Sequence, residues 1–141
     1  MTKPAAATRE LEADMRRIIN PPDIYSPVNS YVHAVAIDSP QTILRMSGQL
    51  GVDKSGAVPG EAVAQAELAW ANIEAILAEA GMSIADITKV TSYIVGTQNI
   101  RDYVEVHKRR VGEAAPPWTL LVVAALGRPE YLIEVDVEAM R

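Results

Sequence analysis

Glu134 is the residue of this chain best suited to acid–base chemistry, because it is a carboxylate inside an alternating apolar segment, Tyr131–Val137. A carboxylate enclosed by a neighbouring surface has a raised pKa, and it can transfer a proton or orient a water molecule. Asp136 and Glu138 follow at the same parity, which instead indicates a solvated acidic face of a strand. The pattern leaves both interpretations open.

Three side chains with rings are further candidates. His107 lies on the apolar stripe of a predicted helix, where a histidine is either a core residue or a proton carrier. Tyr31 begins a predicted strand, where tyrosine serves strand packing or the rim of a pocket. Trp118 follows two prolines that stiffen the backbone, and it is either a core or interface anchor or a platform for a planar ligand.

Ser47-Gly48-Gln49 ends a predicted strand at a loop. A serine hydroxyl can bind a ligand there, and a glycine lets the backbone approach it closely. The motif lacks the flanks of a nucleophile elbow, so a serine hydrolase is not predicted.

Other residue types restrict the chemistry further. The chain has no cysteine and only two histidines, far apart in sequence, which excludes thiolate nucleophiles and disfavours a metal site. Glycine-rich phosphate loops and dinucleotide fingerprints are also absent from the sequence. The residue pattern therefore disfavours a metal site and a nucleotide cofactor.

The bulk properties are those of a globular domain: 141 residues, of which 49% are hydrophobic and 22% charged. The net charge of -5 disfavours nucleic acid as a partner, because phosphate binding needs a basic surface. We see no signal peptide and no apolar run long enough to span a membrane, so we expect a cytoplasmic protein without a membrane partner.

The residues that position these candidates form predicted elements in a definite order. Apolar spacing predicts a short amphipathic helix over Glu10–Ile19 behind a loose tail, so that residues 1–20 form an N-terminal segment and 21–141 the domain. Turn residues between Tyr31–Ile37 and Thr42–Ser47 predict a β-hairpin. The remaining predictions are a helix over Glu61–Ala80, a strand over Ile87–Val95, a helix between Asn99 and Gly112, and strands over Thr119–Leu126 and Tyr131–Val137.

The Thr119–Leu126 segment is apolar at nearly every position, which predicts a strand covered on both faces in the middle of the sheet, beside Tyr131–Val137. The order ββαβαββ predicts an α+β fold with both long helices on one face of the sheet. Only the short N-terminal helix is available to cover the other face, so we expect subunits to associate.

Taken together, these segments resemble the RidA (YjgF-type) family, also called L-PSP endoribonuclease-like. Each piece is short, but the order and spacing of the pieces follow the family. The segments that carry the resemblance are Asn29–Val35 for G-P-Y-S-Q/H-A-V, Ser47-Gly48-Gln49 for S-G-Q, Gln65–Asn72 with Ala80-Gly81 for the helix motif, Asp102–His107 for D-F-x-x-V-N, Pro116–Gly127 for P-A-R-x-x-V-x-V-A-x-L-P, and Ile133–Asp136 for V-E-I-E.

The resemblance implies a chorismate-mutase-like fold, a homotrimer and sites in clefts between adjacent subunits. It also implies cofactor-free hydrolysis of enamines and imines such as 2-aminoacrylate, with Glu134 positioning the water. The chain resembles a divergent member, because Trp118 stands where the family has the arginine that grips the substrate carboxylate, and His107 where it has asparagine. We therefore do not expect efficient 2-aminoacrylate deamination.

Two functions follow as hypotheses. The first is a hydrolase for a small enamine, imine or related planar metabolite, with Glu134, Tyr31 and His107 as catalytic residues. Its substrate-binding residues would be Trp118, Ser47, Gly48 and Thr119. The alternative is a trimer that binds a small metabolite without turnover. RNA cleavage follows only from the family label, and the acidic charge opposes it.

Overall fold

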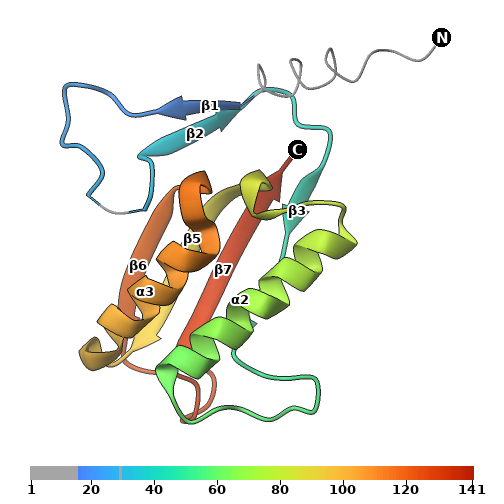
Figure 1. Cartoon of the computed structure of the whole chain (residues 1–141), viewed down its shortest axis with the longest axis vertical. Helices are drawn as coiled ribbons and strands as arrows, with labels where there is room; N and C mark the ends of the chain where they lie inside the picture. Colours follow the sequence, from blue (N-terminus) through green and yellow to red (C-terminus); the bar gives the residue numbers. More distant parts are fainter. Residues whose placement is uncertain (1–15, 29) are drawn as a thin grey trace.

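A mixed sheet with two helices on one of its faces makes up most of the molecule, and a separate two-stranded ribbon stands at one end (Figure 1). This computed structural model describes residues 16–28 and 30–141. The strands and helices are β1 (Arg16–Ile19), β2 (Ala34–Ile37), β3 (Ile43–Arg45), β4 (Gln49–Leu50), α2 (Ala62–Glu79), β5 (Ile87–Val95), α3 (Ile100–Val111), β6 (Trp118–Val123) and β7 (Ile133–Met140), with short 3-10 turns at Ile84–Asp86, Thr97–Asn99 and Gly112–Ala114.

The main sheet is built around β7. Its strand order is β3-β7-β5-β6, and β4 also pairs with β7. The strands β3, β4 and β5 run antiparallel to β7, while β6 runs parallel to β5 after the crossover through α3. Alternate residues of β7 are fully buried under the helices, namely Ile133, Val135, Val137 and Ala139. The predicted α+β architecture with two helices on one sheet face is confirmed.

Both long helices lie where their periodicity predicts them. The first ends before Gly81, whose φ of +72° is the left-handed conformation that glycine adopts at low cost. The second has Asp102 in its first turn and basic residues in its last. One detail differs from the prediction: the Asn99 side chain does not cap α3, because its amide donates a hydrogen bond to the Val95 carbonyl at 2.8 Å.

The predicted central position of the Thr119–Leu126 strand is wrong. The observed strand, β6, is an edge strand, and β5 separates it from β7. Leu121 and Val122 are each 43% exposed. The physical reason is that an apolar run indicates that both faces of a strand are apolar, but not that the strand has a neighbour on each side. The crossover through α3 places β6 beside β5.

Two predictions for the N-terminal third are also corrected. The expected hairpin between Tyr31–Ile37 and Thr42–Ser47 does not form, because β2 pairs with β1 while β3 pairs with β7. Arg16–Ile19, the last part of the predicted Glu10–Ile19 helix, is the strand β1, and the earlier part lies outside the described residues. The β-branched pair Ile18 and Ile19 favours a strand once a partner strand is available.

Across residues 16–28 and 30–141, no helix combines the length and the apolar character needed to cross a membrane.

Candidate functional site

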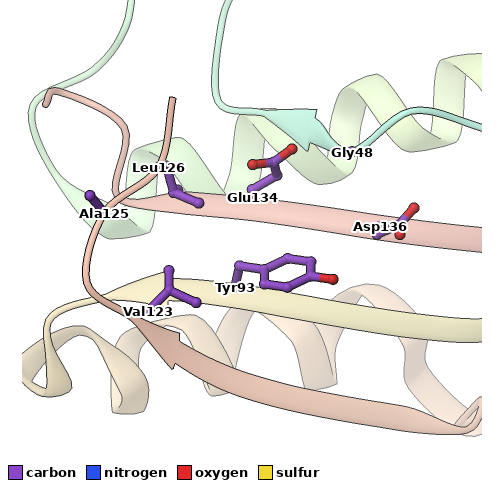
Figure 2. Close-up of a pocket in the computed structure, with 7 residues that line it drawn as sticks. All are labelled: Gly48, Tyr93, Val123, Ala125, Leu126, Glu134 and Asp136. Atoms are coloured by element: carbon purple, nitrogen blue, oxygen red, sulfur yellow. The ribbon is translucent and has the colours of Figure 1, made fainter. Parts of the chain in front are cut away.

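A pocket of about 360 Å³ opens on the sheet face opposite the helices (Figure 2). Figure 2 shows the side chains of Glu134 and Asp136 from β7 together with the ring of Tyr93 from β5. The complete lining is Gly48, Tyr93, Val123, Ala125, Leu126, Glu134 and Asp136.

The parity of β7 places both carboxylates on this face. Ile133 and Val135 are fully buried against the helices, so the residues between and after them, Glu134 and Asp136, must point to the other side. A slip of one residue would put both carboxylates into the core, and the burial of the apolar set therefore fixes the register. Tyr93 is the direct cross-strand neighbour of Glu134, which brings the phenol into the same pocket.

Gly48 makes room for Glu134. A Cβ atom at this position would lie 3.0 Å from the Glu134 Cδ atom and closer still to Oε1. The carboxylate can rest over the backbone of residue 48 only because glycine has no side chain. The prediction that Gly48 permits a close approach thus has a specific geometric basis, with a protein side chain as the group that approaches.

The pocket is acidic and polar without a counter-charge. Its seven lining residues include two carboxylates and a phenol but neither lysine nor arginine. Among the described residues, no hydrogen bond or ion pair engages the carboxylate of Glu134 or of Asp136. Unengaged carboxylate oxygens in a concave site are free to accept hydrogen bonds from a water molecule or from a protonated ligand.

His107 and Trp118 lie on the other side of the sheet, between it and the helices. His107 is fully buried, and its ring stacks on the Trp118 indole with a centroid distance of 3.7 Å and an interplanar angle of 13°. The Trp118 Nε1–H donates a hydrogen bond to the Ser92 Oγ atom at 2.9 Å, and that hydroxyl shares a hydrogen bond of 2.5 Å with the Tyr103 hydroxyl. Neither residue lines the pocket.

Burial controls the protonation of this aromatic cluster. It lowers the pKa of His107 to about 3, and within the described part of the chain neither ring nitrogen has a hydrogen-bond partner. Burial also raises the pKa of Tyr103 to about 12. The imidazole is thus neutral at physiological pH, as expected for a desolvated histidine without a nearby carboxylate.

The other sequence candidates lie outside the pocket of this chain. Ser47 is exposed beside Gly48, and its carbonyl accepts a hydrogen bond of 2.9 Å from the Gln49 side chain. Thr119 is exposed on β6 and accepts a hydrogen bond of 2.7 Å from Lys89 Nζ. Tyr31 precedes β2, with its ring centroid 6.1 Å from that of His33. Of the predicted site residues, the pocket unites Glu134 and Gly48.

Sequence reasoning missed Tyr93 and Asp136 as members of the site. The sequence did contain a signal for Tyr93. It lies between Ser92 and Ile94 on a predicted strand, and since the even-numbered positions from Val90 to Ile94 face the core, Tyr93 faces the other side. Asp136 was noticed only as evidence for a solvated face. In residues 16–28 and 30–141, no group of three or more histidine, aspartate or glutamate side chains is arranged to hold a metal ion.

Comparison with known proteins agrees with this fold. The chain is 31% identical over 128 residues to the 2-iminobutanoate/2-iminopropanoate deaminase of Capra hircus, covering 89% of each protein. The fold matches the Rid-family protein YyfB of Yersinia pestis with a TM-score of 0.80 at 27% identity, covering 90% of this chain and 99% of that one. It also matches Escherichia coli TdcF with bound serine, with a TM-score of 0.66 at 28% identity, covering 89% and 98%.

The sequence pattern of one protein family, Endoribonuclease L-PSP, matches residues 22–141. That range holds both long helices, the whole main sheet and every residue of the pocket. The chain therefore belongs to the endoribonuclease L-PSP family, the RidA/YjgF family that its sequence motifs resemble.

Proposed function

We propose that this protein hydrolyses a small enamine or imine to a carbonyl compound and ammonia, with Glu134 as the residue that handles the water. The observation that carries the proposal is the unpaired Glu134 carboxylate held over Gly48 in a pocket. Relatives named as deaminases of imines and of reactive intermediates support the reaction class.

The pocket residues suit the individual steps. An enamine first takes a proton from solvent on carbon and becomes a protonated imine (iminium). A water molecule bound to the Glu134 carboxylate then adds its oxygen to the imine carbon while the carboxylate takes its proton. The resulting carbinolamine receives that proton on nitrogen, and its C–N bond breaks. As ammonia leaves, the hydroxyl group gives its proton to the Glu134 carboxylate and the carbonyl forms. The Tyr93 hydroxyl lies on the adjacent strand and can hydrogen-bond the substrate nitrogen.

The charge of the pocket narrows the substrate. Two carboxylates without a lysine or arginine in the lining attract a protonated iminium and repel an anionic acid. A carboxylate substrate would also find no charge-assisted hydrogen bond of the kind worth about 1.5–3 kcal/mol, because neither lysine nor arginine lines the pocket. The preferred substrate is therefore neutral or cationic, and 2-aminoacrylate is a poor one.

The site is completed between subunits of a homotrimer in this proposal. The helix-free sheet face exposes apolar residues such as Leu121, which subunit contact would cover. Tyr31, Ser47 and Thr119 would then line the cleft from both sides, although they lie apart in one chain. We assign His107 and Trp118 to the support of β5 and β6 from behind. A monomer found by light scattering at micromolar concentration would contradict the proposal of a cleft between subunits.

The test is a panel of imines generated enzymatically from neutral, cationic and acidic amino acids, followed by ammonia release. We expect the Glu134→Gln variant to lose about 10²-fold or more of the rate, because general base catalysis has that magnitude. Glu138→Gln is the matched control, since this residue lies on the same strand and face but pairs with Arg45 instead of lining the pocket. Equal rates for Glu134→Gln and wild type would contradict the role of Glu134.

The alternative is a trimer that binds a small metabolite without turnover. It is favoured by one observation, that the related TdcF has been solved with bound serine. Calorimetric titration of amines and amino acids into wild type and Glu134→Gln separates the two functions. Binding that depends on Glu134, together with no ammonia release across the panel, would establish the alternative.

A further inference from the structure

The ribbon formed by β1 and β2 packs only loosely against the rest of the chain. None of its residues is buried, and Ile18 is 65% exposed. The loop that joins its strands exposes Tyr25 and Val28 at 71% and 76%. An isolated two-stranded hairpin is marginally stable in water, and a third strand or a packed face normally completes it.

In the described part of the chain, β2 and β3 each have one edge without a strand partner, and these two edges could pair with each other. β2 pairs with β1 alone, which leaves its other edge open, and β3 pairs with β7 alone, which leaves its outer edge open. Ile43 on β3 is 53% exposed. Open edges with exposed apolar side chains are sites where strands of another chain add.

The segment between the two strands, Asp38–Gln41, has the composition of a hairpin turn, yet it connects strands of two different sheets. Ser39 in this segment has a φ of +51°, a left-handed conformation that is strained for a residue with a side chain. A short strained hinge next to a strand that the sequence would pair locally is the usual setting for exchange of an element between copies.

Contacts at the far side of the ribbon hold it in its open position. The Arg16 guanidinium donates a hydrogen bond of 2.5 Å to the carbonyl of Ile87, at the start of β5. Arg16, Val35 and Pro117 line a small cavity between the ribbon and the body. Folding the ribbon back onto β3 of the same chain would break these contacts, whereas pairing it with another chain keeps them.

We propose that the β1–β2 ribbon pairs through its open β2 edge with the open β3 edge of a second copy of this chain, and that every copy in the assembly donates one ribbon and receives one. The strand pairing is the one that the turn composition predicts, formed between chains instead of within one. The exchange extends each main sheet by the two ribbon strands and covers the exposed apolar side chains of β3. This inference is independent of the proposed hydrolysis.

The test uses disulfide formation, which is clean here because the natural chain has no cysteine. Continuing the β2–β3 pairing outward from Asp38–Gln41 makes residue 36 the neighbour of 43, and 35 the neighbour of 44. Two double variants, Ala36→Cys with Ile43→Cys and Val35→Cys with Leu44→Cys, cover both alternating kinds of antiparallel pair. The control is Arg45→Cys with Glu138→Cys, a pair that the structure places within one chain.

Each variant is prepared as an equal mixture of unlabelled and ¹⁵N-labelled chains that are unfolded and refolded together, then oxidised at several dilutions. We expect the 36–43 or the 35–44 pair to give covalent oligomers whose cross-linked peptides carry both labels, while the control cross-links only within a chain. Cross-links within single chains at 36–43 and 35–44 would overturn the proposal in favour of a closed hairpin. Failure of both pairs to cross-link while the control does would also overturn it.

Discussion

The two faces of the main sheet differ in what they carry, although the same strands supply both. The face under the helices holds fully buried apolar side chains, and it packs against Trp70 of α2 and against Tyr103 and His107 of α3. The opposite face holds Tyr93, Glu134 and Asp136 around a pocket. The buried face gives the chain most of its stability and fixes the parity of each strand, and this leaves the other face free to vary for binding and chemistry.

The largest effect should come from the core of the helix-covered face. Truncating Trp70, which is fully buried, removes a large apolar surface and leaves a cavity, so Trp70→Ala should lower the free energy of unfolding by about 3–5 kcal/mol. Leu121→Ala on the open face is the counterpart and should cost the single chain under ~1 kcal/mol, with any further loss arising from the subunit contact proposed there. Urea denaturation of both variants measures the difference. Equal losses would mean that the open face is as tightly packed as the other.

The second effect is a loss of stability in acid. The folded protein keeps His107 neutral, because burial lowers its pKa from 6.5 to about 3. Below about pH 6.5 the unfolded chain binds a proton at His107 while the folded chain does not. The free energy of unfolding therefore decreases by up to about 1.4 kcal/mol for each unit by which the pH is lowered between roughly 6.5 and 3.

The His107→Phe variant should lose that slope. The informative window is about pH 5–6.5, because other paired groups contribute to the pH dependence only below it. Hydrogen bonds from Arg109 and Arg110, for example, lower the pKa of Glu67 from 4.5, so its carboxylate stays ionised throughout the window. Urea midpoints at several pH values within the window provide the measurement. A variant whose acid sensitivity equals that of wild type would show that another group causes the loss.

The smallest effect on stability should occur at Gly48, together with a large effect on the site. A methyl group there displaces the end of the flexible Glu134 side chain, so Gly48→Ala should cost under ~1 kcal/mol but reduce turnover or binding as Glu134→Gln does. Gly51→Ala is the control, because its Cβ would lie 2.5 Å from the Gln65 carbonyl oxygen and should cost about 1–3 kcal/mol. Unchanged ligand binding in Gly48→Ala would show that the position of the Glu134 carboxylate is not critical.

The sequence by itself determined the two long helices and the face of β7 that carries Glu134. Helical spacing located both long helices, and alternation in β7 placed Glu134 on the face opposite the core. These features are local, since each depends on periodicity within a single segment. The motif order also identified the family, which the match over residues 22–141 confirms.

Only the tertiary structure decided which segments meet. It moved β6 to the edge of the sheet and paired β2 with β1. It also brought Tyr93 of β5 beside Glu134 and Asp136 of the neighbouring strand β7. It also placed His107 and Trp118 together beneath the helices, away from the pocket. Apolar patterning predicts that a side chain is buried, but it does not predict which residues the side chain packs against. Those neighbours depend on strand order and crossovers, which are set by contacts between residues far apart in the chain.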